Sequence, residues 1–543
     1  MYRIKEISGN IVDLQNSSIY PGTLYISDSR IREITRDKDN YDTFIVPGLV
    51  DAHVHIESSM LVPSEFARLA VVHGTVAAVS DPHEIANVLG TGGVDYMIDN
   101  SRNVPFKFYF GAPSCVPATD FETSGAVIGA DEVERLLKRD EIKYLSEVMN
   151  FPGVISKDPV LTAKIASAKK HNKQIDGHAP GLRGEALKQY IRAGITTDHE
   201  SLNYEEAKEK LSLGMKILIR EGSAARNLDE LIGLIRHSPD QCMFCSDDKH
   251  PDDLLKGHID LHVRKALKRG YNIFDILRCA SLNPVRHYGL GVGLLQQGDY
   301  ADFLVIDDLA DFKILKTCIN GEIVAEQGRC LIEKASSDVI NRFAAHKKSP
   351  NDFQVKKSGD MINVIEVTDG LLTTGRTKEL PSLNDGFVIS DVSRDILKLA
   401  VVNRYIDARP SVAFVRNFGL KKGAIASSVA HDSHNVVAVG VTDEEISRAV
   451  NLVIENRGGL SVVCDSHEDA LALPVAGLMS AEDGYEVGGK YAVVDRLARE
   501  LGSGLRAPFM TLSFMALLVI PSLKLSDKGL FDAERFEFIG LFE

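Results

Sequence analysis

Eight apolar runs alternate with segments of helical length between Phe44 and about Pro251, and each run ends in polar or reactive side chains. Apolar strands separated by helices are typical of a parallel sheet with both faces covered. Eight such units in about 210 residues predict an α/β fold, a (β/α)8 TIM-type barrel with its active site at the carboxyl ends of the strands. The runs are "FIVPGLVDAHVH", "TVAAVSDPHE", "FKFYFGAPSC", "IKYLSEVMN", "KQIDGHAPG", "GITTDHES", "KILIREGSA" and "CMFCSDDKHP".

The segments on both sides of the barrel alternate apolar and polar positions and contain turn residues, which predicts short antiparallel strands. We expect these two segments to complete one β-sandwich together. Beyond them, β-like runs such as "NVVAVGVT" alternate with helical stretches. The predicted domains are a composite β-sandwich (1–45 and 292–335), the barrel (46–291), a linker or covering helix (336–358) and a C-terminal α/β domain (359–543).

The composition excludes several classes of partner. With 62 basic and 76 acidic side chains, the formal charge of -14 gives no basic field for a phosphate backbone, so we expect no nucleic-acid partner. The N-terminus lacks a secretion-signal layout, and no apolar segment approaches the roughly 20 residues that cross a bilayer. We therefore expect a cytoplasmic protein without a membrane partner. Seven scattered cysteines predict free thiols rather than disulfides.

Five side chains of types that bind metals stand at the ends of four predicted strands. His53 and His55 are two positions apart, so they point the same way from the first strand. An isolated His-x-His is usually incidental, but His178, His199 and Asp247 follow the fifth, sixth and eighth runs. Imidazole and carboxylate suit Zn²⁺, Fe²⁺ or Mn²⁺, and this set has more donors than one tetrahedral ion needs. The sequence therefore predicts two divalent cations.

Two neighbouring cations repel each other and need a bridging anion from the protein. In "EIKYLSEVMN", both Lys143 and Glu147 have the parity to face inward, so either a carbamylated lysine or a glutamate could bridge. Glu147 stands nearer the carboxyl end of the strand. We predict that Glu147 bridges the cations and that Lys143 is solvated at the start of the strand.

These motifs resemble the adenine deaminase family of the amidohydrolase superfamily. The resemblance rests on "VPGLVDAHVHIESSML", "VSDPHEIANVLG", "SEVMNFPGV", "DGHAPGL", "TTDHES" and "FCSDDKHPDDLL", and it extends to "VRNFGLKKGAIASSVAHDSHNVVAVG" near the C-terminus. It implies hydrolysis of adenine to hypoxanthine and ammonia in purine salvage at a di-iron or di-manganese centre, with Zn²⁺ also compatible. The residues that match the metal ligands of the family are His53, His55, Glu147, His178, His199 and Asp247.

Hydrolysis at an aromatic carbon needs a group that takes a proton from water and a group that protonates the ring. Asp247, a ligand beside the water, is our candidate for the first. The ring donor stays open among Glu57, Glu84, Glu200 and Asp248, any of which could instead orient a ligand.

Other positions next to the motifs have open roles. His83 and Glu84 could be an additional ligand pair or hydrogen-bonding partners of the ligands. Ser114 and Arg183 stand in loops where they could contact substrate, although structural roles are the commoner case. In the C-terminal region, "AHDSHN" contains His431 and His434, which we expect to have a local structural role.

Two other functions remain open on the residues alone. A cyclic amidase of the dihydroorotase or hydantoinase type would keep the barrel and metals, but it would bridge the cations with a carbamylated lysine. A non-enzymatic scaffold would have lost ligands. We expect a small-molecule substrate and a homo-oligomer, for example a dimer, although the sequence does not fix the oligomeric state.

Overall fold

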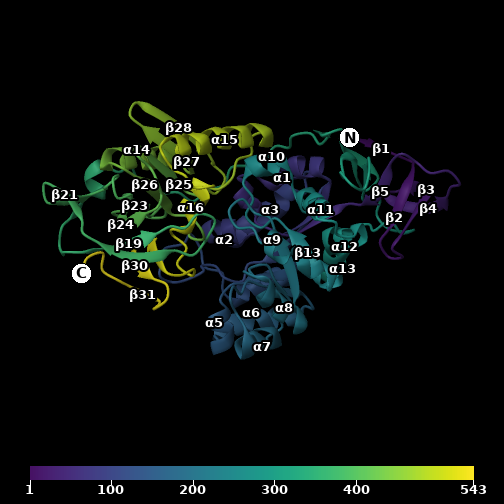
Figure 1. The fold of residues 1–543 in the computed structure, drawn as a ribbon, viewed down its shortest axis with the longest axis horizontal. Coiled ribbons are helices and arrows are strands. Elements are labelled where there is room, and N and C mark those ends of the chain that lie inside the picture. Colours follow the sequence, from purple (N-terminus) through teal and green to yellow (C-terminus); the bar gives the residue numbers. More distant parts are fainter.

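A computed structural model describes residues 1–543, and a curled sheet of parallel strands lies at its centre (Figure 1). Five strands pair in the order β10-β9-β8-β7-β6 and three in the order β11-β12-β13. Val54 bridges Asp247 at one junction, and Thr196 N donates to Ile175 O at 2.9 Å at the other. The curled sheet fits a TIM-type barrel. Its strands are β6 (Leu49–Val54), β7 (Thr75–Ser80), β8 (Lys107–Ala112), β9 (Ile142–Val148), β10 (Gln174–Gly177), β11 (Thr197–Asp198), β12 (Lys216–Arg220) and β13 (Cys242–Cys245).

Helices connect these strands and cover the outside of the curled sheet (Figure 1). Several begin at a side-chain cap: the Asp158 carboxylate accepts from Leu161 N at 2.8 Å, and the Asn203 amide oxygen accepts from Glu206 N at 3.1 Å. The helices are α1 (Pro63–Ala70), α2 (His83–Leu89), α3 (Thr91–Ser101), α4 (Ala130–Leu137), α5 (Phe151–Ser156), α6 (Pro159–Lys170), α7 (Gly184–Arg192), α8 (Tyr204–Ser212), α9 (Leu228–Leu231), α10 (Pro251–Lys256), α11 (Ile259–Lys268), α12 (Ile273–Leu277) and α13 (Asn283–Tyr288).

Strands from before and after the barrel segment share one nine-stranded sheet. β14 pairs antiparallel with β5, which also pairs with β2, so the two flanks meet at the centre of the sheet. Its buried apolar side chains, among them Ile11, Ile45 and Phe303, form a cluster of their own. The members are β1 (Tyr2–Arg3), β2 (Glu6–Asp13), β3 (Ser18–Ser27), β4 (Arg30–Arg36), β5 (Phe44–Pro47), β14 (Phe303–Ile306), β15 (Ile314–Ile319), β16 (Glu322–Glu326) and β17 (Arg329–Cys330).

An extended segment joins this sheet to the C-terminal region. Residues 331–349 contain no helix, and a single 3-10 turn, η6 (Pro350–Phe353), follows. Arg404 Nη2 hydrogen-bonds the carbonyl of Arg342 at 3.2 Å, and Ala344 N donates to Arg404 O at 2.7 Å. Contacts with the C-terminal sheet therefore fix the path of the segment.

The C-terminal region is built on an eight-stranded sheet that is antiparallel except at the β19–β24 pair. Alternate residues of β26 face opposite sides: Val436 packs in the cluster that contains Ile446 of α14, and Val437 in the main core with Val487 of α15. Figure 1 shows this region and the flank sheet on opposite sides of the barrel. The sheet order is β20 (Gly375–Glu379), β19 (Ile362–Glu366), β24 (Ser411–Arg416), β23 (Ile396–Val402), β26 (Val436–Gly440), β25 (Ala424–Ser427), β27 (Gly459–Cys464) and β28 (His467–Ala472).

Three helices and two small sheets complete the C-terminal region. α14 (Asp443–Glu455) packs on one face of the eight-stranded sheet, and α15 (Gly484–Glu500) and α16 (Pro508–Phe514) pack on the other. The small sheets are β18 (Val355–Lys356), β22 (Phe387–Ile389) and β21 (Ser382–Asn384), and β29 (Leu523–Ser526), β30 (Gly529–Asp532) and β31 (Glu537–Phe538).

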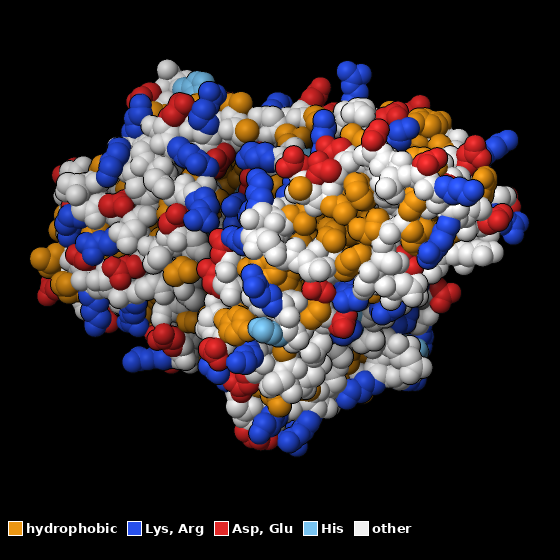
Figure 2. All heavy atoms as spheres, turned by 45° about the vertical axis from the view of Figure 1, so that its right-hand side comes forward, with side chains coloured by type: hydrophobic (Ala, Val, Ile, Leu, Met, Phe, Trp, Pro, Cys, Tyr) orange, Lys and Arg blue, Asp and Glu red, His pale blue; other side chains and the backbone are white.

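Charged side chains of both signs are mixed on the surface. On the face in Figure 2, Lys and Arg side chains are interspersed with Asp and Glu and form no continuous basic band. None of the helices combines the length and apolarity that crossing a membrane requires. All seven cysteines are free thiols, and burial raises the pKa of Cys242 in β13 to about 12.

Candidate metal centre

The six predicted ligands lie together at the carboxyl ends of five barrel strands. His53 and His55 flank the last residue of β6, and Glu147 is the last but one residue of β9. The others follow β10, β11 and β13. Five of the six side chains are at most 6% exposed, and His178 is 15% exposed. The strand ends thus bring together side chains that are up to 194 positions apart.

The Glu147 carboxylate lies between two pairs of histidines. Its Oε2 atom is 2.7 Å from His178 Nδ1 and 3.2 Å from His199 Nε2. Its Oε1 atom is 3.2 Å from His55 Nε2 and 3.9 Å from His53 Nε2. Each carboxylate oxygen therefore faces a different pair, which is the arrangement that a bridging carboxylate needs.

Asp247 closes the side of the cluster that is next to β6. Its Oδ1 atom is 3.2 Å from His55 Nε2 and 3.5 Å from His53 Nε2. The backbone holds it there, because Asp247 N donates to His53 O at 2.9 Å. The side chains of Asp247, His53 and His55 therefore converge at one position.

Electrostatics keeps both carboxylates ionised. Burial by itself raises the pKa of Glu147, but the charges of His199 and His178 and their hydrogen bonds outweigh it and hold the pKa well below the usual value. The pKa of Asp247 is also held well below its usual value, because the Arg220 charge and the hydrogen bonds from His53 and His55 outweigh the effect of burial. Metal ligands must be deprotonated, so this environment suits cation binding.

The donor set fits a pair of cations. His53, His55 and Asp247 each offer a ligand atom within 4.8 Å of the others, as do His53, Glu147 and His199. Buried imidazole and carboxylate groups are the ligands that Mn²⁺, Fe²⁺ and Zn²⁺ share. Lys143 is the second residue of β9, at the other end of the strand from Glu147, and is partly exposed.

The chain is similar to known proteins along nearly its whole length. Residues 44–324 match the model of the amidohydrolase family, and residues 371–537 match that of the adenine deaminase C-terminal domain. An adenine deaminase of Sulfurovum sp. is 58% identical, over 98% of this chain and 99% of the relative. One from Salinibacter ruber is 56% identical, over 99% of this chain and 98% of the relative.

The chain belongs to the adenine deaminase family. Its amidohydrolase match spans the barrel that carries the ligand cluster, so the family and the geometry agree on the same site. The C-terminal match covers most of the region beyond the linker, including residues that lie next to that cluster.

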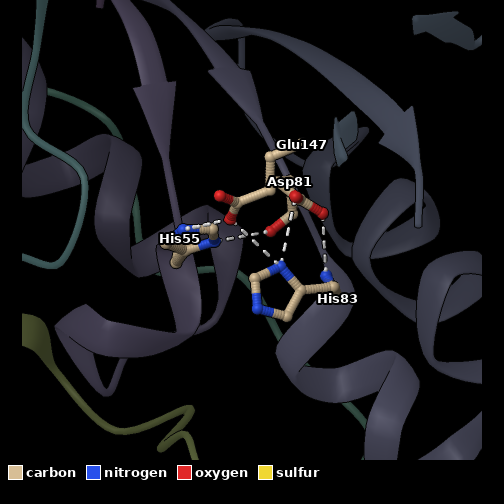
Figure 3. Close-up of side chains that lie close together, drawn as sticks. All are labelled: His55, Asp81, His83 and Glu147. Carbon is tan, nitrogen blue, oxygen red and sulfur yellow. Dashed lines mark hydrogen bonds and ion pairs between the residues drawn. The ribbon is translucent and has the colours of Figure 1, made fainter. Parts of the chain in front are cut away.

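In this family member, a further histidine stands beside the Glu147 carboxylate (Figure 3). His83, the first residue of α2, has its Nδ1 atom 3.1 Å from Asp81 Oδ2 and 3.6 Å from Glu147 Oε1. His55, Asp81, His83 and Glu147 form a group that could hold an ion. The end of β7 thus contributes two side chains, Asp81 and His83, to the cluster. Asp81 was not among the predicted residues.

Glu84 connects the barrel to the C-terminal region of this adenine deaminase family member. His431 Nδ1 and His434 Nε2 both hydrogen-bond the Glu84 carboxylate, and all three side chains are buried. The expected local role of the two histidines is therefore wrong. They stand in a loop before β26 that tertiary packing brings to the barrel mouth, a contact between residues about 350 positions apart.

Arg220 is a second residue that the sequence reasoning missed. Its Nη1 atom donates to Asp247 Oδ2 at 2.5 Å, and its Nη2 atom to Glu200 Oε2 at 2.9 Å. The guanidinium therefore orients a predicted ligand and holds Glu200 beside it. Arg220 ends the seventh apolar run, which is the signal that would have identified it.

The predicted proton donors occupy different positions. Asp248 lines the cavity at the cluster, and Ser58 Oγ donates to its Oδ1 atom at 2.5 Å. Glu57 is buried beneath the site, where it accepts from Ile85 N at 3.1 Å, and burial raises its pKa to about 7. Glu200 lines the cavity too.

Neither predicted substrate contact is found at the cavity. Ser114 is buried, and its hydroxyl donates to the Glu147 carbonyl at 2.5 Å, so it supports the strand end. Arg183 caps α7 at the surface, where its half-exposed side chain donates to Glu209 at 2.6 Å. Neither side chain therefore lines the cavity, because loop residues lack the fixed side-chain alternation that made the strand ends predictable.

Proposed function

We propose that this protein hydrolyses adenine to hypoxanthine and ammonia, in purine salvage, at a centre that holds two divalent cations. The observation that carries the proposal is the Glu147 carboxylate between two histidine pairs, in a chain that is 58% identical to an adenine deaminase over 98% of its length. A glutamate at this position also argues against the cyclic amidases, which bridge through a carbamylated lysine.

The two cations would share Glu147. His53, His55 and Asp247 would hold one of them, and His178 and His199 the other. When bound, such a pair lowers the pKa of a water molecule to near neutrality and so supplies the nucleophile that attacks C6 of adenine. Mn²⁺ or Fe²⁺ is our assignment, with Zn²⁺ accepting the same ligands.

The protein's own groups would move the protons. Asp247 takes the proton of the attacking water, and Arg220 holds the other carboxylate oxygen so that Oδ1 faces the cluster. The ring nitrogen must gain a proton as the tetrahedral centre forms. The proton that Asp247 took then passes to the amine, which leaves as ammonia, and the hydroxyl proton returns to the ring donor. Glu200 and Asp248 line the cavity and are the candidates for this donor, whereas Glu57 supports α2 from beneath.

We also propose a cellular compartment and a domain architecture for this protein. The free cysteines support a reducing compartment, and we assign the protein to the cytoplasm. We also infer that the eight parallel strands close into a (β/α)8 barrel over about residues 46–291, with the flank sheet as its composite β-sandwich.

Ammonia release from adenine, cytosine and guanine, with ring opening of dihydroorotate measured separately, tests the proposal when Mn²⁺ or Fe²⁺ is supplied during expression. We expect release from adenine to exceed that from every other compound. Ring opening of dihydroorotate without deamination of adenine would reverse the assignment in favour of a cyclic amidase.

A further inference from the structure

The C-terminal region forms one wall of the cavity over the candidate metal centre. We call this set the C-terminal wall: Leu372, His431, Asp432, Phe514, Leu517 and Ile520. Four of its six side chains are apolar, whereas ten barrel residues that line the same cavity are all ionisable except Met149. The cavity therefore has a reactive side and an apolar side, which suits a flat, mostly apolar ring that reacts at one edge.

Buried polar contacts hold the wall in place. The fully buried Lys524 Nζ donates to the Leu372 carbonyl at 2.9 Å and to the Phe514 carbonyl at 3.0 Å. The His431 ring stacks on Phe514, with centroids 4.8 Å apart and planes inclined by 9°. Because His431 also hydrogen-bonds Glu84, the wall is anchored to the barrel.

Asp432 is the wall residue with an unsatisfied polar atom. It is 3% exposed and lines the cavity, and its Oδ2 atom has no hydrogen-bond partner. Its Oδ1 atom is 3.9 Å from His83 Nε2, which is longer than a hydrogen bond. A buried carboxylate oxygen without a donor is costly, so this position suits a ligand that brings an N–H group.

The position of Asp432 matches the far end of a purine. His83 lies between the two carboxylates, with Nδ1 3.6 Å from Glu147 Oε1 and Nε2 3.9 Å from Asp432 Oδ1. Asp432 and the Glu147 carboxylate are therefore separated by the imidazole ring of His83. In adenine, the reacting C6 is in the six-membered ring and the ring N–H is in the five-membered ring, so a base with C6 at the centre can direct its N–H toward this wall.

We propose that Asp432 accepts a hydrogen bond from the imidazole-ring N–H of the purine base while the apolar wall residues pack against the ring. The inference rests on the proposed function and deepens it, because it names the group that selects a free base over a base substituted at that nitrogen. A carboxylate accepts such a bond with charge assistance, which makes it a strong determinant of binding.

Comparison of adenine with 9-methyladenine, which lacks an imidazole-ring N–H, tests the role of Asp432. Asp432→Ala is expected to lower kcat/KM for adenine about 10- to 100-fold and to leave 9-methyladenine nearly unchanged or improved. The inhibition constants of hypoxanthine and 9-methylhypoxanthine are measured in parallel, so the comparison does not depend on turnover. Asp432→Asn, whose amide oxygen can still accept, is the matched control and should recover much of the preference.

The outcomes separate this inference from the function itself. Equal losses for the methylated and unmethylated bases in Asp432→Ala would overturn the role of Asp432, whatever the size of the loss. Metal content measured on the same samples shows whether the centre is intact. Failure of the wild-type protein to deaminate adenine with Mn²⁺ or Fe²⁺ would instead reject the proposed function.

Discussion

The barrel side of the cavity and the C-terminal wall are built in different ways. The barrel side takes its ligands from strand ends, where each follows an apolar run and its direction is set by the alternation of the strand. The wall takes Leu372, Asp432 and Phe514 from segments that are about 60 and 80 residues apart, and none of them lies within a strand. Strand ends position the reactive groups, and a helix end together with irregular segments completes the surface that meets the ligand.

The largest effect is expected on the barrel side, at Glu147. Glu147→Gln removes the anion between the two histidine pairs, so it should reduce kcat on the order of 10³-fold or more and lower the bound metal below two ions per chain. Ammonia release and metal analysis of the purified protein measure both effects.

Lys143→Met is the matched control for Glu147. Lys143 is on the same strand but near its other end and partly exposed, so its loss should leave metal content and kcat close to wild type. Two results together would assign the bridging role to the lysine instead: loss of the metals from Lys143→Met, and a mass of the wild-type protein that includes a carbamate on Lys143.

A smaller loss is expected at Asp247, whose role combines binding and proton transfer. Asp247→Asn should keep part of the metal and lower kcat about 10²-fold, at the lower end of the range for general acid–base groups. Single-turnover ammonia release, with metal content measured on the same sample, separates the two roles. Unchanged turnover would show that another group takes the proton.

The smallest effect is expected on the wall, at Lys524. Lys524→Met removes the donor to the Leu372 and Phe514 carbonyls, so KM for adenine should rise about threefold to tenfold. Metal content and kcat should stay near wild type, because the lysine touches no ligand. A fall in kcat with unchanged KM would contradict the division of labour between the two sides.

The same variant has a signature in the pH dependence of stability. Burial lowers the pKa of Lys524 to about 7, whereas an unfolded lysine titrates near ~10.4. Between these values the unfolded chain binds more protons, so the free energy of unfolding of wild type should rise with pH relative to Lys524→Met. Urea denaturation of both proteins at pH 7 and at higher pH measures the difference, and a constant difference would show that the group does not titrate in this range.

The positions of the Arg183, His431 and His434 side chains were not predictable from the sequence, for one physical reason. Arg183 follows His178 in a loop, and its side chain pairs with Glu209 at the surface. His431 and His434 also stand in a loop, yet they reach Glu84. Side-chain direction in a loop depends on the packing of the whole chain, so the neighbouring sequence indicated neither outcome. Arg220 differs: it ends a strand, and the rule that identified the ligands would have identified it too.

The sequence by itself determined the curled parallel sheet and the group of ligands at its strand ends. Apolar runs specify strands, the alternation of the strand specifies direction, and the fold places the carboxyl ends together, so local patterns were sufficient. Only the tertiary structure decided that Asp432 and Phe514 face this cluster. These contacts join segments with no shared periodicity, and packing of the C-terminal sheet on the barrel brings them together.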